Sequence, residues 1–325
     1  GEFSLKDALR LQMNPSTMIK GNAADNIEVT NGEWLESVFQ KLRSPEFIDA
    51  AQPGDGFTAK LRPYQQKGVN WLCFHHSLRF GMCLADDMGL GKTVQALALL
   101  HILKTKARPA NEVCSANLLI VPASLLANWQ DEINKFAPDI SFLIAHPGAS
   151  EDRTVTPLKT DDIDKLDLVI TTYSLIQRYE WLHNYEWNCI IIDEAQAIKN
   201  PSAQQTKAVK RLKANNRIAM TGTPVENSLS DLWSIFDFIN PGLLGSSAEF
   251  GQFIKRLKNE PDGYARLRRI VSPYILRRMK TDKSVISDLP DKVEMKTYSS
   301  LSRRQIVLYK EMVNELKKTV ENTEG

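Results

Sequence analysis

This sequence has few side chains that form disulfides or bind metals. Its 325 residues include only four cysteines and five histidines. No two cysteines form a C-x-x-C pair and the histidines lack zinc-motif spacing, so neither a disulfide scaffold nor a zinc site is expected. Scattered cysteines of this kind are typical of buried, reduced thiols and predict a cytoplasmic protein. The pair His75-His76 is expected on a helix surface.

Long apolar stretches and a strong net charge are also missing. No apolar run reaches the ~18 residues of a membrane-spanning helix, so no membrane partner is predicted. The formal net charge is only +2, which leaves any binding of nucleic acid to local basic patches. With 42% hydrophobic and 25% charged residues, the composition is that of a soluble globular protein with room for more than one domain.

The most informative stretch is Asp86-Asp87-Met88-Gly89-Leu90-Gly91-Lys92-Thr93, which lies between an apolar run at 81–85 and a helical pattern that begins at Val94. Strand, glycine-rich turn and helix in this order predict a phosphate-binding loop. Lys92 is then expected to reach the phosphates of ATP, and the Thr93 hydroxyl to hold Mg²⁺. The general pattern has glycine where this chain has Asp86, and an ordinary strand–helix turn is the alternative.

Short apolar runs alternate with helical patterns through the rest of the chain. Near-continuous apolar strands between helices predict an α/β fold with a parallel sheet covered on both faces, whose ligands bind at the carboxyl ends of the strands. The expected strands are 117–122, 141–145, 168–172, 189–192 and 218–221, and two of the expected helices are 124–136 and 204–212.

Two of these strands end in polar groups suited to catalysis. Asp193 and Glu194 follow Ile190-Ile191-Ile192; Asp193 is expected to hold Mg²⁺ opposite Thr93, and Glu194 to orient and deprotonate the attacking water. Two solvated acids at a helix start are the alternative, which the phosphate loop upstream makes less favoured. The next strand leads into Thr221-Gly222-Thr223, whose hydroxyls are expected to bond the acids and respond to the nucleotide; a plain threonine-rich turn is the alternative.

A glutamine ahead of the loop suits a purine base. Arg62-Pro63-Tyr64-Gln65 opens a predicted helix, with Pro63 in its first turn. The Gln65 amide carries a donor and an acceptor that match the edge of adenine, although a surface glutamine is more often simply solvated.

The order of six segments resembles the Swi/Snf branch of the superfamily 2 helicase-type ATPases, which are double-stranded DNA translocases. The resemblance covers about residues 57–310. The residues around Gln196 are similar to those of prokaryotic members, which implies a cytoplasmic protein that associates with the nucleoid. The segments are 61–65 (LRPYQ), 87–93 (DMGLGKT), 119–129 (LIVPASLLANW), 170–173 (ITTY), 193–200 (DEAQAIKN) and 220–224 (MTGTP).

This resemblance implies a role for each motif. Arg62, Gln65 and Met88-Gly89-Leu90-Gly91-Lys92-Thr93 are expected to bind ATP, Thr93 and Asp193 to hold Mg²⁺, and Lys92, Asp193 and Glu194 to act in hydrolysis. Thr221, Gly222 and Thr223 are expected to couple ATP to movement. Pro122-Ala123-Ser124 and Thr171-Thr172-Tyr173 are expected to hold one strand of double-stranded DNA by its phosphates.

Composition and resemblance together predict four regions. Residues 1–56, with amphipathic patterns at 5–11 and 34–42, form an accessory segment and linker; 57–228 form a RecA-like ATP-binding lobe. Residues 229–285 form a helical insertion of that lobe, and 286–325 open a second RecA-like lobe. In the family the second lobe supplies arginine fingers, which are worth roughly 10³–10⁵ in rate in comparable reactions. The present chain is therefore expected to bind ATP weakly and to hydrolyse it slowly.

Basic side chains gather at 199–217 and 251–283, and the second stretch includes Arg268 and Arg269. Contact with DNA phosphates is expected there, with a solvated helix face as the alternative.

Two rival functions remain: an RNA helicase or restriction-type motor, and a non-hydrolytic nucleic-acid-binding scaffold. The insertion argues against the first, and the intact Lys92, Thr93, Asp193 and Glu194 against the second. The protein substrate that such a motor would remodel on DNA is not specified.

Overall fold

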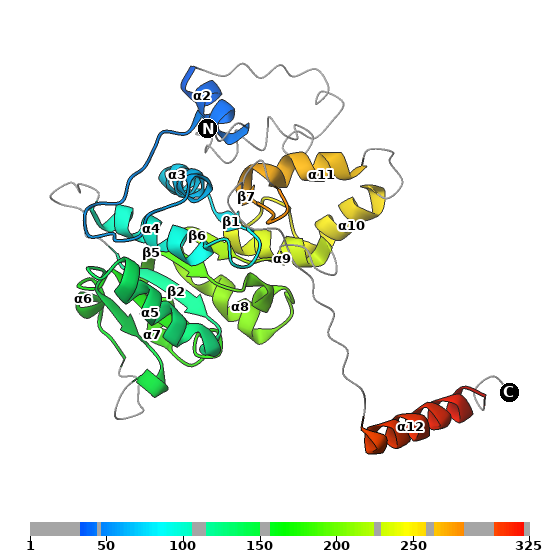
Figure 1. Ribbon diagram of the computed structural model, residues 1–325. Helices are drawn as coiled ribbons and strands as arrows, with labels where there is room; N and C mark the ends of the chain where they lie inside the picture. The colour runs from blue at the N-terminus through cyan, green and yellow to red at the C-terminus, as the bar shows by residue number, and fades with distance from the viewer. Residues whose placement is uncertain are drawn as a thin grey trace. The chain divides into compact units, whose positions relative to one another are not determined.

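The computed structural model describes residues 33–43, 47–105, 115–149, 157–223, 229–257, 263–282 and 302–321. The chain divides into two units, Gly1–Ile286 and Ser287–Gly325. The first contains the sheet shown in Figure 1, and the second contains helix α12, Arg303–Glu321. The expected domain boundaries stay a prediction. The pattern expected at 5–11, the last residue of the segment 220–224 and the first part of the expected second lobe, 286–301, lie outside the described residues.

A seven-stranded parallel sheet forms the centre of the first unit. Its strand order is β3-β4-β2-β5-β6-β1-β7, and every adjacent pair is parallel. Parallel neighbours need crossover connections, which the intervening helices supply. The α/β class predicted from the sequence is therefore confirmed. The strands are β1 (Met82–Leu84), β2 (Asn117–Val121), β3 (Phe142–Ile144), β4 (Leu168–Thr172), β5 (Glu186–Ile192), β6 (Lys213–Met220) and β7 (Ile275–Leu276).

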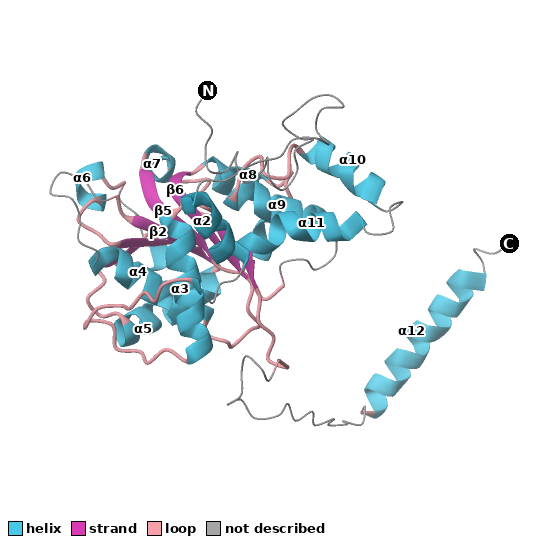
Figure 2. Ribbon diagram, turned by 90° about the horizontal axis from the view of Figure 1, so that it is seen from above, coloured by secondary structure: helices cyan, strands magenta, loops and turns pink. Residues whose placement is uncertain are grey.

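Helices cover both faces of the sheet because alternate residues of each apolar strand point to opposite sides. In β5, Ile190 and Ile192 join one core, whereas Cys189 and Ile191 join the other. The core around Ile191 is closed by α3 (Pro63–Ser77), α4 (Lys92–Thr105) and α5 (Leu126–Phe136). The opposite core is closed by α7 (Glu180–Asn184), α8 (Gln204–Arg211) and α9 (Leu229–Ile239), and Figure 2 shows the two helical layers on either side of the strands.

The helical segment after β6 packs on the same unit. Phe236 of α9, Phe250 of α10 (Ser247–Leu257) and Leu267 of α11 (Gly263–Val271) all belong to one of the two sheet cores. The chain then returns through the short turn Ser272–Tyr274 to β7, which pairs with β1 at the edge of the sheet. Two further helices are α2 (Glu33–Arg43), at the predicted pattern 34–42, and α6 (Thr160–Ile163).

Two strands are longer than their apolar runs. β5 begins at Glu186 and β6 at Lys213, and these polar residues pair with each other in register. The two-residue strand β7 has no sequence signal of its own, since it exists only through its pairing with β1. No helix among the described residues is both long and apolar enough to span a bilayer.

The prediction for His75 is wrong. Its side chain is fully buried, with its ring 4.2 Å from the Trp71 ring, rather than on a helix surface. Nδ1 lies 2.9 Å from the Trp71 carbonyl oxygen and Nε2 lies 2.8 Å from that of Pro273. The turn after α11 covers this face of α3, which no local pattern in α3 indicates.

Candidate functional site

Three chain segments meet at the carboxyl edge of the sheet. Leu84 of β1 lies opposite Met220 of β6, and Ala219 of β6 lies opposite Ile192 of β5. The three strands therefore end at one edge, and the phosphate loop, the acidic pair and the threonine turn follow them directly. These elements are separated by many residues in the chain and are brought together by strand register.

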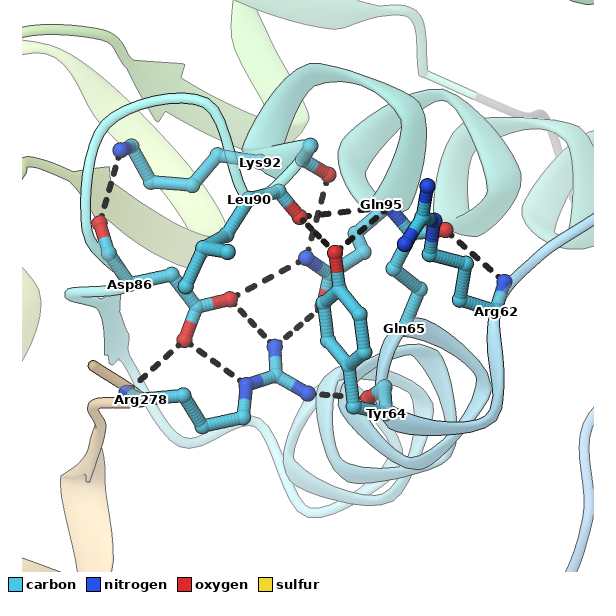
Figure 3. A network of polar contacts seen from close by, with 9 residues as sticks. Arg62, Tyr64, Gln65, Asp86, Leu90, Lys92, Gln95 and Arg278 are labelled. Carbon is cyan, nitrogen blue, oxygen red and sulfur yellow. Dashed lines mark hydrogen bonds and ion pairs between the residues drawn. The ribbon is translucent and has the colours of Figure 1, made fainter. Parts of the chain in front are cut away.

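The loop between β1 and α4 has the backbone of a phosphate cradle. Gly89 and Gly91 have φ angles of 81° and 77°, which strain any residue with a Cβ atom. Helix α4 begins at Lys92 and thus directs its first N–H groups toward the loop. Lys92 Nζ donates a hydrogen bond of 2.8 Å to the carbonyl oxygen of Asp86, which folds the lysine back over the loop in Figure 3. These residues fit a bound triphosphate.

Asp193 accepts hydrogen bonds from three donors, two on its carboxylate and one on its backbone carbonyl. Oδ2 accepts a 2.9 Å bond from the indole of Trp129, Oδ1 accepts one of 2.9 Å from the Glu194 N–H, and the backbone carbonyl accepts one of 2.6 Å from Tyr173. Burial raises the pKa of Asp193, while the hydrogen bonds from Trp129 and Glu194 and the positive charge of Lys92 oppose that rise. Asp193 and Lys92 are therefore within electrostatic reach at the same edge, where a carboxylate, a threonine hydroxyl and phosphates make a suitable Mg²⁺ set.

Glu194 has a strained backbone and a defined side-chain partner. Its φ angle of 50° lies in the left-handed region, a conformation that costs about 1–2 kcal/mol in a non-glycine residue and concentrates at functional sites. Gln196 Nε2 donates 2.7 Å to Glu194 Oε2, and Gln196 Oε1 accepts 3.0 Å from the Thr221 hydroxyl. The Thr223 N–H in turn donates 3.1 Å to Thr221 Oγ1. The threonine turn is thus linked to the acid through Gln196, and not by the direct bond expected from the sequence.

Gln65 is bonded to the phosphate loop itself. Its Oε1 accepts 2.9 Å from the Arg62 N–H and its Nε2 donates 3.2 Å to the Leu90 carbonyl oxygen. The Tyr64 hydroxyl donates 3.2 Å to the same oxygen. Both ends of the amide are therefore engaged, and its predicted contact with adenine stays a prediction.

The segments predicted to hold DNA differ in what they expose. Ala123 and Ser124 are exposed in a short turn at the carboxyl end of β2. In contrast, Thr171 is buried and donates 3.0 Å to the Ala145 carbonyl oxygen, and Tyr173 is buried against Asp193. Those two hydroxyls are already used inside the protein, and the Thr172 hydroxyl lies 3.2 Å from that of Ser174; the predicted phosphate contact of this segment stays a prediction. Arg268 and Arg269 are exposed on α11.

Two residues of α5 contribute to the site without having been predicted. Besides Trp129, the half-buried Glu132 bonds to the side chain of Thr93, and burial raises the pKa of Glu132 while that bond and one from Asn128 lower it. Trp129 and Glu132 are three positions apart and thus share one face of the helix. The pattern at 124–136 could have placed them together, but only the tertiary structure shows which neighbour that face has.

Comparisons with a family model and with related sequences point to one protein family. Residues 64–325 match the SNF2-related domain family. The chain is 38% identical over 311 residues to the putative ATP-dependent helicase/translocase YwqA of Bacillus subtilis, an alignment with 93% of this chain and 32% of the relative. It is 35% identical to the chromatin-remodeling ATPase INO80 of Mus musculus, with 90% of this chain and 19% of the relative covered.

A solved structure shares both fold and sequence. The Sulfolobus solfataricus SWI2/SNF2 ATPase core in complex with double-stranded DNA has 43% identity and a TM-score of 0.65, over 85% of this chain and 56% of that chain. The present chain spans about a third of the length of YwqA and less of INO80. Since the family match includes the phosphate loop, the acidic pair and the threonine turn alike, the chain belongs to the SNF2-related domain family.

Proposed function

We propose that this chain is the ATP-binding part of a DNA-dependent ATPase that moves along double-stranded DNA and remodels protein–DNA complexes. The observation that carries the proposal is the convergence of Lys92, Thr93 and Asp193 at one sheet edge, following β1 and β5. Relatives named as an ATP-dependent helicase/translocase and a chromatin-remodeling ATPase support it, as does a similar core solved with double-stranded DNA.

Each residue of the edge has a part in this proposal. Lys92 and the loop N–H groups bind the phosphates, and Gln65 beside the loop recognises adenine. Thr93 and Asp193 hold Mg²⁺, which when bound neutralises charge that develops on the phosphates. Glu194 orients the attacking water and accepts its proton. Arginine side chains of a second RecA-like lobe complete the site.

The link through Gln196 supports a coupling role for the threonine turn. Because Gln196 bonds both Glu194 and Thr221, a change at the acid can reach residues 221–223 through two hydrogen bonds. The exposed segment at Ala123 and Ser124, and Arg268 and Arg269 on α11, are the proposed contacts with DNA phosphates, which would bind without reading sequence.

The proposal is tested by titrating the chain with a fluorescent ATP analogue in the presence of Mg²⁺. Lys92→Ala should abolish measurable binding, whereas Lys67→Ala, an exposed lysine of α3, should leave it unchanged. Hydrolysis is then measured with the second lobe added, with duplex DNA or duplex RNA. Equal stimulation by RNA would favour an RNA motor, and binding that does not depend on Lys92 would remove the proposal.

A further inference from the structure

A buried ion pair joins the phosphate loop to the edge strand β7. Asp86 follows β1 and Arg278 follows β7, in a parallel pair that sets Leu84 opposite Leu276. Arg278 Nε donates 2.8 Å to Asp86 Oδ1, and Nη2 forms an ion pair with Oδ2. Asp86 is fully buried and Arg278 is only 8% exposed, so the pair is shielded from water. Figure 3 shows the contacts between the two side chains.

The guanidinium also reaches the two helices beside the loop. Nη2 donates 2.7 Å to Gln95 Oε1 in α4, and Nη1 donates to the Tyr64 carbonyl oxygen in α3. Gln95 Nε2 in turn donates 3.1 Å to Asp86 Oδ2 and 3.1 Å to the Gly91 carbonyl oxygen. A single side chain thus connects β7, the loop, α3 and α4.

Backbone bonds hold the same two segments side by side. The Ala85 N–H donates 2.7 Å to the Leu276 carbonyl oxygen, and the Asp87 N–H donates 3.0 Å to that of Arg278. The carbonyl oxygen of Asp86 accepts the 2.8 Å bond from Lys92 Nζ. The residue whose side chain is held by Arg278 is therefore also the residue that holds the phosphate-binding lysine.

We propose that Arg278 is a positioning residue of the nucleotide site, acting through Asp86 to hold the phosphate loop and Lys92 in place for a triphosphate. This rests on the proposed function. A buried ion pair is seldom more stabilising than apolar residues of the same shape, whereas the planar fork of arginine sets the orientation of the carboxylate that it binds. The pair also explains the aspartate in the loop: its side chain is turned toward Arg278, and only Gly89 and Gly91 in this loop have positive φ angles.

Helix α3 comes close to this network at Gly68. A Cβ atom there would lie 1.9 Å from Gln95 Oε1 and 2.8 Å from Arg278 Nη2. Gly68→Ala therefore displaces the two side chains without removing a charge, and alanine is favoured over glycine inside a helix. This variant therefore tests whether the positions of the Gln95 and Arg278 side chains matter for ATP binding when both charges of the ion pair are kept.

The test compares ATP affinity of the 325-residue chain and its variants, with Mg²⁺, at a temperature well below each melting transition. Arg278→Lys keeps the charge but loses the fork, and should weaken ATP binding about 10-fold or more, a change of ~1.4 kcal/mol. The control Arg277→Lys changes the adjacent, exposed arginine and should stay within about twofold of wild type. A purely structural role lowers the melting temperature but leaves the affinity of the folded protein intact.

Gly68→Ala should weaken binding in the same direction, and it gives the answer if Arg278→Lys does not fold. Folded Arg278→Lys, or in its place folded Gly68→Ala, that binds ATP as wild type does would overturn the proposal. Binding that requires Lys92 but not Arg278 removes this inference alone, whereas a wild-type chain that binds no ATP removes the proposed function with it.

Discussion

The indole nitrogen of Trp129 donates a hydrogen bond of 2.9 Å to the carboxylate of Asp193. Trp129 lies in α5, the helix that follows the turn with the exposed Ala123 and Ser124, whereas Asp193 follows β5. A segment proposed to contact DNA and a carboxylate proposed to hold Mg²⁺ are therefore joined by one buried bond. This relationship makes Trp129 a sensitive place to test the site.

Trp129→Phe should shift Mg²⁺-dependent ATP binding to higher pH. Burial raises the pKa of Asp193, and the hydrogen bond from Trp129 opposes that effect. Without this donor the pKa of Asp193 rises further, so its carboxylate ionises only at a higher pH. The measurement is ATP affinity as a function of pH at limiting Mg²⁺. Trp187→Phe is the control, because this buried indole donates 2.9 Å to the Leu182 carbonyl oxygen, away from the site. Identical pH profiles for Trp129→Phe and wild type would contradict the prediction.

Glu194→Gln should separate binding from hydrolysis. The amide keeps the size of the side chain but accepts no proton, so ATP affinity should change little while turnover falls by roughly 10²–10⁴. Turnover is measured with duplex DNA and the second lobe present. Glu186→Gln, at the exposed start of β5, is the matched control. Turnover close to wild type in Glu194→Gln would show that another group accepts the proton of the attacking water.

Replacing both Arg268 and Arg269 with alanine should flatten the salt dependence of DNA binding. Each phosphate contact contributes ~0.9 to the slope of log K against log salt, so the slope should fall by about 1–2. The paired control is Lys159→Ala with Lys165→Ala, exposed lysines at and after α6, which lies far from α11 in both Figures 1 and 2. An unchanged slope in the arginine variant would indicate a solvated helix face.

His75 should make the fold sensitive to acid. Burial lowers its pKa from 6.5 to about 4, although hydrogen bonds to the Trp71 and Pro273 carbonyls oppose the change. Between these two values the unfolded chain binds a proton that the folded chain excludes, so the free energy of unfolding falls as pH decreases through that window, by about 3 kcal/mol in all.

Urea unfolding at about pH 7 and about pH 5 measures the part of this loss that falls above pH 5, about 2 kcal/mol. In His75→Gln the titrating group is absent, so the difference in unfolding free energy between the two pH values should shrink. His146→Gln, a partly exposed histidine after β3, should retain it. A His75→Gln variant as acid-sensitive as wild type would assign the loss to other groups.

The parts of this protein that could be predicted are those encoded in neighbouring residues. The loop 86–93 carries its own glycines, lysine and threonine, and the strands before Asp193 and Thr221 are apolar enough to be recognised alone. The register of β1, β6 and β5 then brings these strand ends to one edge, as parallel sheets require. Gln196 was recognised only as a family signature, because its two partners come from different strand ends.

The sequence by itself determined the α/β class, the phosphate loop and the acidic pair, because strand periodicity and the backbone needs of a phosphate site are local properties. Only the tertiary structure decided that Trp129 supports Asp193, that His75 is buried, and that Arg278 holds Asp86 from 192 positions away. The physical reason is that a buried polar group, once water is excluded, forms its hydrogen bonds with the groups that are packed beside it. That neighbour is set by the packing of strands and helices, which no short stretch of residues contains.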